Sequence, residues 1–192
     1  MKKHIAAAVL ITFLALTTTH LFAKNSKGGA MKSLVVYYSV TGNTELAAKT
    51  IAETLNADIL KIEEVKQRSK NFIVLVFTVA FDAIKDKCSE IKPVNPDINK
   101  YDLIFIGSPV WAGKPAPAVN SFINQSDFKN KNVVAFVTLA GKDPAGAIAS
   151  MKDKIEKKSG KIIGSFSVRA QKNKPEEIKQ KTIDAISQYK TK

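Results

Sequence analysis

An apolar run that ends in a hydroxyl-rich turn constrains this chain more than any other feature. Residues Val35–Tyr38 have the character of a buried β-strand, and Ser39–Thr44 is a polar turn that contains one glycine. A helix is expected directly after the turn, because Ala48, Ile51 and Leu55 recur with the spacing of one helical face. The sequence therefore predicts a strand, a polar loop and a helix N-terminus, in that order.

This order of elements suits the binding of an anion. The first turn of a helix carries unpaired backbone N–H groups and the positive end of the peptide dipole. Ser39, Thr41 and Thr44 add hydroxyl donors, and Gly42 would let a phosphate approach the backbone. The pattern GxxxxGK[ST] is absent, so this is not a phosphate loop of the ATPase type. Two interpretations stay open, namely a loop that binds a monophosphate through neutral donors and an ordinary turn with a helix cap.

Residues 1–30 are expected to lie outside the fold. A short basic head followed by the apolar run Ile5–Leu16 is typical of a secretory signal that is removed after Ala23. If the apolar stretch is extended to Phe22, it nears the minimum of ~17 residues for a membrane-spanning helix and would stay as an anchor. The protein would then be exported or membrane-anchored through residues 1–23. In a third interpretation Met31 is the true start, and the protein is cytoplasmic.

The remaining residues, 31–192, suffice for one domain with a substantial core. Both histidines precede Met31, which excludes an imidazole base and the commonest zinc sites from this domain, so no metal site is expected. Cys88 is the only cysteine, and an internal disulfide is therefore excluded.

The charge of the chain is strongly positive. The formal net charge is +13, and because residues 1–30 hold four lysines and no acid, the domain carries +9. Such a balance favours an acidic protein or an anionic membrane surface as partner. Nucleic acid is not expected, because the lysines are scattered and are not interleaved with aromatic residues.

The rest of the chain alternates between predicted strands and predicted helices. Further strands are expected at Ala57–Ile62, Tyr101–Gly107, Val133–Val137 and Ile162–Val168. Helices are expected over Phe72–Phe81, after Pro115 and Pro117, after Asp143 and Pro144, and from Pro175 onward. Five strands alternating with five helices predict an α/β domain with a parallel sheet between two helix layers.

Three loops of unusual chemistry follow predicted strands: Ser39–Thr44, Ser108–Gly113 and Thr138–Lys142. They would meet at one edge of the sheet, where open α/β sheets bind ligands. The second loop offers the flat indole of Trp111, so a planar heteroaromatic compound with a phosphate tail would suit this edge. The alternative is that Trp111 is an ordinary core or interface residue.

On these residues the chain resembles the flavodoxin family, in particular the flavodoxin-like proteins with a G-S/T-P-x-W-x-G loop. The resemblance extends over residues 31 to about 190 and is carried by Val35–Ser39 with Thr41–Thr44, and by Tyr101–Gly113 with Pro115–Val119. It implies a flavodoxin-like three-layer α/β/α sandwich with a five-stranded parallel sheet of order 2-1-3-4-5. It also implies one noncovalently bound flavin mononucleotide, FMN.

The resemblance implies three groups of residues around the flavin. The phosphate would be held by Ser39, Val40, Thr41, Gly42, Asn43 and Thr44. One side of the isoalloxazine ring would be lined by Pro109, Val110, Trp111, Ala112 and Gly113. The ring would be faced from the third loop by Thr138, Leu139, Ala140 and Gly141.

The resemblance implies an FMN-dependent redox protein that transfers electrons to a redox partner protein or a small-molecule acceptor. The flavin performs the chemistry, so no side chain is expected to be catalytic. Two departures from flavodoxins that shuttle electrons, a third loop without an aromatic residue and a basic surface, keep open an NAD(P)H-dependent oxidoreductase that reduces quinones or similar acceptors. A third alternative is a basic binding module that has lost its cofactor.

Overall fold

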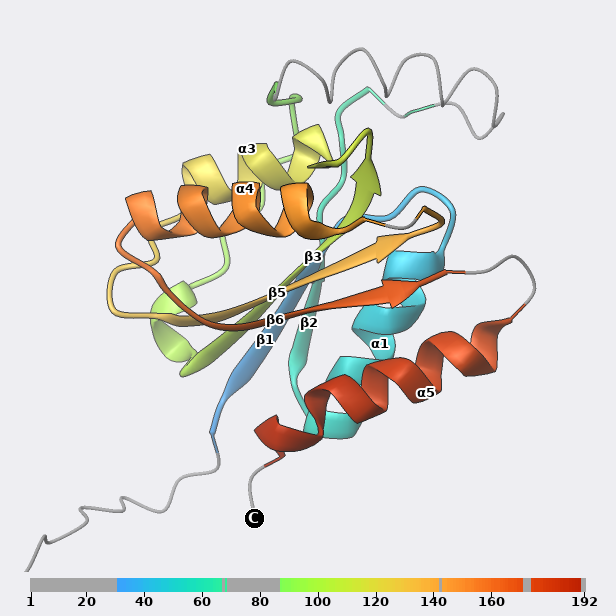
Figure 1. Ribbon diagram of the computed structural model, residues 1–192. Coiled ribbons are helices and arrows are strands. Elements are labelled where there is room, and N and C mark those ends of the chain that lie inside the picture. The colour runs from blue at the N-terminus through green and yellow to red at the C-terminus, as the bar shows by residue number, and fades with distance from the viewer. Residues whose placement is uncertain (1–30, 67, 69–86, 142, 171–173, 191–192) are drawn as a thin grey trace, which may run out of the picture.

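The computed structural model describes residues 31–66, 68, 87–141, 143–170 and 174–190. These residues form a sheet with helices on both faces, the layered α/β arrangement that the sequence predicts (Figure 1). The helix predicted over Phe72–Phe81 lies outside the described residues. A search of the described residues for a helix both long and apolar enough to cross a membrane finds none.

The sheet has five parallel strands and one short antiparallel strand. The strands are β1 (Ser33–Tyr37), β2 (Asp58–Lys61), β3 (Leu103–Trp111), β4 (Lys114–Pro115), β5 (Asn132–Leu139) and β6 (Lys161–Arg169). The α-helices that the structure describes are α1 (Asn43–Leu55), α3 (Pro117–Gln125), α4 (Ala145–Lys157) and α5 (Pro175–Ile186), with 3-10 turns at Ile98–Lys100 and Ser187–Tyr189.

The parallel strands lie in the order β2-β1-β3-β5-β6, and β4 pairs with β3 alone. Without β4 this is the order 2-1-3-4-5, so the predicted topology is confirmed. The reversal of strand order falls between β1 and β3, and this is where an open α/β sheet binds its ligands.

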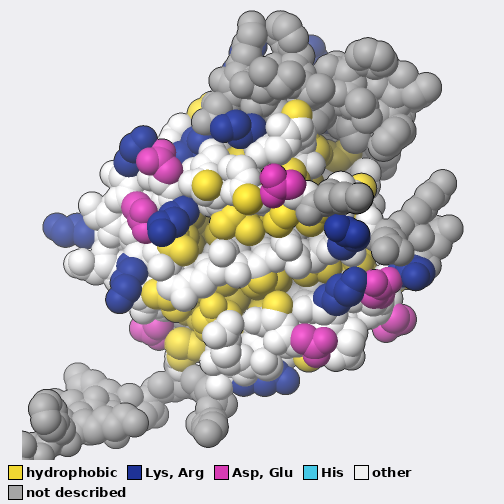
Figure 2. Space-filling view, viewed as in Figure 1, with side chains coloured by type: hydrophobic (Ala, Val, Ile, Leu, Met, Phe, Trp, Pro, Cys, Tyr) yellow, Lys and Arg dark blue, Asp and Glu magenta, His cyan; other side chains and the backbone are white. Residues whose placement is uncertain are grey.

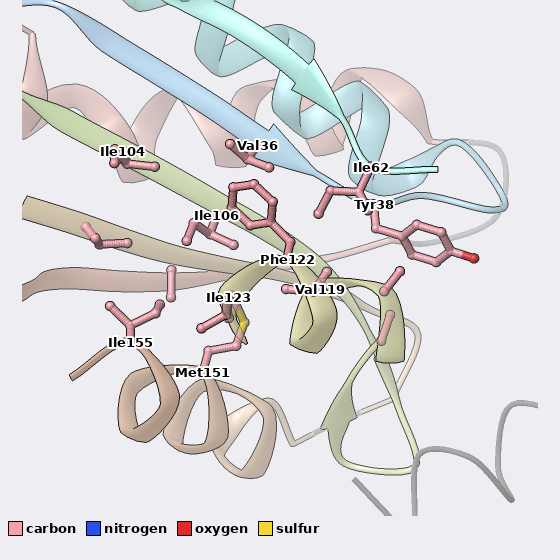
Figure 3. Close-up of a cluster of buried hydrophobic side chains, with 14 of the residues drawn as sticks. Val36, Tyr38, Ile62, Ile104, Ile106, Val119, Phe122, Ile123, Met151 and Ile155 are labelled. Atoms are coloured by element: carbon pink, nitrogen blue, oxygen red, sulfur yellow. The ribbon is translucent and has the colours of Figure 1, made fainter. Parts of the chain in front are cut away.

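The core has two halves, one on each face of the sheet. Helices α3 and α4 cover one face, and α1 and α5 cover the other (Figure 1). Side chains of the central strands alternate between the halves, so that Val36 and Ile106 point toward Phe122 of α3 (Figure 3) whereas Val35 and Phe105 lie in the other half. Strands covered on both faces need the near-continuous apolar runs that the sequence shows.

The strand predicted over Tyr101–Gly107 is longer in the structure, because β3 continues to Trp111. Its last residues pair antiparallel with β4, in the register Val110 to Pro115 and Trp111 to Lys114. The two residues of the turn, Ala112 and Gly113, have φ values of +47° and +76°. Positive φ at both central residues is the conformation of the tight type I′ hairpin turn. The segment predicted as a loop over Ser108–Gly113 is therefore largely a hairpin.

Candidate functional site

The loop between β1 and α1 has the open backbone that the sequence predicts. Gly42 takes a φ of +90°, and a side chain built on it would meet no atom within 4 Å, so the conformation and not crowding favours glycine here. The Ser39 hydroxyl accepts the Gly42 N–H at 3.1 Å, which shapes the turn. No side chain caps the N-terminus of α1. Its first-turn N–H groups therefore remain available as donors.

The first and third loops are joined by a hydrogen bond between two threonines. The Thr44 and Thr138 hydroxyls lie 2.7 Å apart, and both side chains are buried. The structure thus brings together the N-terminus of α1 and the carboxyl end of β5, as the topology predicts. The two hydroxyls are hydrogen-bonded to each other. Thr44 therefore connects the two loops, whether or not it also donates to a ligand.

The four residues named for the third loop divide into two pairs. Thr138 and Leu139 belong to β5 and are buried, and the Leu139 carbonyl accepts the Ala170 N–H at 2.9 Å. Ala140 and Gly141 follow the strand and are exposed. Of the loop residues that the structure describes, the two exposed ones are therefore both small.

The turn of the β3–β4 hairpin packs closely against α4. A side chain on Gly146, in the first turn of α4, would lie 2.7 Å from the Gly113 carbonyl oxygen, so the hairpin turn and the helix are in close contact. At the base of the hairpin, Pro109 is in register with Thr138 of β5. The second and third loops are therefore neighbours at the same edge of the sheet.

Trp111 is half-buried and lies against two residues that the sequence did not single out as ligands. The Tyr38 ring is perpendicular to the indole, with 5.8 Å between ring centroids. The Arg68 guanidinium lies over the indole, with its Cζ 5.3 Å from the centroid. Trp111 also packs against the core on the α3 side of the sheet, so it is anchored at one end and partly open at the other.

The two residues that contact Trp111 are both bonded to one buried carboxylate, that of Glu64. It accepts hydrogen bonds from the Tyr38 hydroxyl at 2.5 Å and from Arg68 Nε at 2.9 Å. Burial, followed by the hydrogen bond to Glu64, raises the pKa of Tyr38 well above its ordinary value. Tyr38 therefore stays protonated and acts as a hydrogen-bond donor. Figure 3 shows its hydroxyl pointing away from the apolar side chains around it.

Sequence reasoning missed this cluster of Tyr38, Glu64 and Arg68. Tyr38 stands at the end of the first predicted strand, and Glu64 lies just beyond the strand predicted over Ala57–Ile62. Arg68 lies in a polar stretch with no periodicity. The one signal available was composition, because Arg68 is one of only two arginines among 30 basic residues. Arginine can stack on an aromatic ring and bind a carboxylate at the same time, which lysine does less well.

The acid that follows the loop Ser39–Thr44 directly in sequence is paired with two lysines. Glu45, in the first turn of α1, pairs with Lys49 at 2.8 Å and with Lys61 at 3.1 Å. Its hydrogen bonds to Lys49 and then Lys61 lower the pKa of this carboxyl. A negative charge near the N-terminus of α1 is thus offset locally, and a bound anion would meet less repulsion from it.

Among the described residues there is no group of three or more His, Cys, Asp or Glu residues that could hold a metal ion. What the site offers is a set of hydroxyl groups, helix N–H groups and a half-buried indole, joined at the carboxyl ends of β1, β3 and β5. Such a set can hold a phosphate at one end and a planar ring at the other.

Comparison with known proteins gives relatives along most of this domain. The family model described as flavodoxin matches residues 32–178. An uncharacterised protein of Methanocaldococcus jannaschii is 31% identical over 140 residues, which are 71% of this chain and 73% of that protein. The flavodoxin-like domain-containing protein BilS of Clostridioides difficile is 32% identical over 139 residues, 71% of this chain and 64% of BilS. This chain thus matches less than two thirds of the length of BilS.

Solved structures give the same result for the fold. The crystal structure of a flavoprotein from Lactobacillus acidophilus in complex with FMN superposes with a TM-score of 0.63 and is 28% identical in sequence. The match covers 72% of this chain and 93% of that flavoprotein. Together with the strand order and the match of the family model over residues 32–178, this shows that the chain belongs to the flavodoxin family.

Proposed function

We propose that this protein is an electron carrier that holds one FMN noncovalently at the carboxyl edge of its sheet. The observation that carries the proposal is the joining of an uncapped helix N-terminus and a half-buried tryptophan at one edge. The hydrogen bond between Thr44 and Thr138 and the register of Pro109 with Thr138 connect the three loops involved. FMN has the corresponding parts, an anionic phosphate and a planar tricyclic ring.

The donor set fits this cofactor. The loop Ser39–Thr44 contains no acid, its Gly42 leaves open space over the backbone, and Thr41 is exposed. These residues and the first-turn N–H groups of α1 would hold the phosphate. Trp111 and the hairpin turn would lie beside the ring, and Ala140 with Gly141 would approach it from the third loop.

Bound FMN supplies the one-electron or two-electron chemistry, and the chain binds, orients and shields the ring. Tyr38 does not supply a proton near neutral pH, because its pKa is raised and its hydroxyl is bonded to Glu64. No described side chain is assigned a role as acid or base in this proposal.

A second candidate function is an NAD(P)H-dependent oxidoreductase that reduces quinones or similar acceptors. It is favoured by the small, exposed Ala140 and Gly141 in the third loop, which would leave room for a second planar compound. The two functions differ in what they need. The oxidoreductase turns over with NADPH or NADH and a quinone alone, whereas the carrier needs a separate reductase.

The deciding experiment is a titration of purified protein with FMN, followed by turnover assays. The carrier is expected to take up one FMN, to show flavin absorption at about 450 nm, and to reduce no quinone with NADPH or NADH until a flavodoxin reductase is added. Turnover without the reductase would favour the oxidoreductase. Protein that stays colourless in excess FMN would contradict both and favour the cofactor-free binding module.

A further inference from the structure

The ion pair of Glu64 and Arg68 is unusual for its burial. The two side chains are 4% and 11% exposed, whereas those of the neighbouring pair Glu63 and Lys92 are 49% and 53% exposed. Taking two charges out of water costs free energy that their attraction often fails to recover. Stability alone is therefore a weak reason for a buried ion pair at this position. The residues that contact the pair indicate a different role.

Glu64 is fixed through both its side chain and its backbone. Its carboxylate accepts hydrogen bonds from Tyr38 of the strand end and from two nitrogens of Arg68, at 2.5 to 3.1 Å. On either side of it the chain pairs with residues 90–92, through the Val65 N–H to Glu90 and the Lys92 N–H to Glu63. The carboxylate therefore has a defined orientation, and so has the guanidinium bound to it.

Both partners of Glu64 contact Trp111. The Arg68 guanidinium covers one face of the indole at 5.3 Å, and the Tyr38 ring meets it at an interplanar angle of 86°. A face that already carries a guanidinium is not available for another planar group. The cluster thus limits both the tilt of the indole and the surface that it can offer.

We propose that Glu64 and Arg68 are positioning residues, which hold Trp111 in one orientation so that a flavin meets the face of the indole opposite the guanidinium. This inference rests on the proposed binding of FMN. Arg68 is suited to the role because its planar guanidinium binds the carboxylate through its edge and the indole through its face. Neither residue needs to touch the flavin.

The first test needs no cofactor, because Trp111 is the only tryptophan in the chain and its fluorescence reports on this site alone. Arg68→Met keeps much of the side-chain length but removes the guanidinium. We expect it to lower the fluorescence anisotropy of Trp111 in the FMN-free protein and to shift its emission. The matched control is Glu63→Gln, which disturbs the adjacent exposed pair and should leave both signals unchanged. Equal anisotropy in Arg68→Met and wild type would overturn the positioning role.

The second test measures FMN affinity in a double-mutant cycle. Arg68→Met is expected to weaken binding by about 2- to 30-fold, the range for a cation–π contact at a partly desolvated site. In a Trp111→Ala background the same substitution should change the affinity by less than about twofold, because a residue that acts through Trp111 has nothing left to position. If Arg68→Met weakened FMN binding by the same factor in both backgrounds, the proposal would be overturned, since Arg68 would then act independently of the indole.

Two further variants keep the test decisive. If Arg68→Met does not fold because Glu64 is left unpaired, the double variant Glu64→Gln with Arg68→Met removes both charges and enters the same assays. Arg68→Lys should recover little of the lost anisotropy, and full recovery would show that charge alone suffices and contradict the geometric argument. Wild-type protein that binds no FMN would contradict the proposed function, whereas normal FMN binding with unchanged Arg68→Met contradicts only the positioning role.

Discussion

Thr41 and Thr44 belong to the same loop, but the structure gives their hydroxyls different surroundings. Thr44 is buried and bonded to Thr138, whereas Thr41 is exposed. A bound phosphate would therefore be expected to depend on Thr41 as a ligand and on Thr44 for the geometry of the loops. This difference makes Thr41 the cleaner residue for a test of phosphate binding.

We expect Thr41→Val to weaken FMN binding by about 1.5 to 3 kcal/mol, the range for a hydrogen bond to a charged group. Riboflavin, which lacks the phosphate, should bind equally well to both proteins. Fluorescence titration with each flavin measures the two affinities. Thr54→Val, at the other end of α1, is the matched control and should change neither. Equal losses for FMN and riboflavin would show that Thr41 does not contact the phosphate.

Tyr37 gives a prediction for alkaline pH. Burial, and then the charge of Glu45, raises the pKa of Tyr37 from 10.0 to about 12. Because the unfolded chain loses this proton near pH 10 while the folded chain keeps it, the unfolded state binds fewer protons above that pH. The contribution of Tyr37 to stability is thus complete below pH 10 and is lost as the pH rises toward 12.

Urea unfolding of wild type and Tyr37→Phe at a series of pH values measures this contribution. The difference in unfolding free energy should be constant below about pH 10 and should then move in favour of the variant, which has no proton to lose at this position. Lysines titrate in the same range, but they are common to both proteins and cancel in the difference. If the difference in unfolding free energy stayed constant up to pH 12, this would contradict the raised pKa of Tyr37.

At the residue level, the ligand candidates that could be predicted were those that belong to a short, recognisable sequence motif. Gly42 and Trp111 stand in short motifs, and the structure places both at the carboxyl edge. Glu64 and Arg68 could not be found in this way. Their partner Tyr38 directly follows β1 and their partner Trp111 ends β3, and contacts between such distant segments leave no periodicity in the sequence.

Among the elements that the structure describes, the β3–β4 hairpin departs furthest from its prediction. The run Gly107–Ser108–Pro109 is typical of a strand end, because proline donates no hydrogen bond and glycine weakens a strand. In the structure Gly107 is needed inside β3, since a side chain there would lie 2.1 Å from the Phe136 ring. Tertiary packing thus explains a glycine that local rules assign to a turn, and pairing with β5 and then β4 extends β3 beyond it.

The turn of this hairpin gives a prediction for stability. Gly113 has a φ of +76° and open space around it, so an alanine there would suffer backbone strain without a steric clash. We expect Gly113→Ala to destabilise the protein by about 1 to 2 kcal/mol, the cost of the left-handed conformation for an L-residue. Gly141→Ala is the matched control, because that glycine also has open space but no positive φ.

Chemical unfolding of the three proteins measures both effects. Gly141→Ala should stay within about 0.5 kcal/mol of wild type, as surface substitutions usually do. If the two variants lost the same free energy, the turn would not be of the type that the structure shows. Gly113→Ala should also weaken FMN binding, because a distorted hairpin turn would displace the neighbouring Trp111.

For the whole molecule, the sequence predicted the layers and the strand order, because right-handed crossovers and short connections leave few alternatives for alternating strands and helices. It also gave the net charge, and the structure adds how that charge is distributed. Lysines are spread over the face shown in Figure 2, interspersed with acidic side chains, and no single basic patch dominates it. On this face the positive charge therefore acts mainly as a long-range field.

This field predicts how the reduced flavoprotein meets its electron acceptors. Residues 31–192 carry a formal charge of +9, so an anionic oxidant such as ferricyanide should be attracted and a cationic one such as hexaammineruthenium(III) repelled. Raising the ionic strength from 0.01 M to 0.15 M shortens the Debye length from about 30 Å to about 8 Å. Stopped-flow oxidation should then become slower with ferricyanide and faster with the ruthenium complex. The same sign of salt dependence for both oxidants would mean that charges close to the flavin outweigh the net charge, and an acidic redox partner would lose its support.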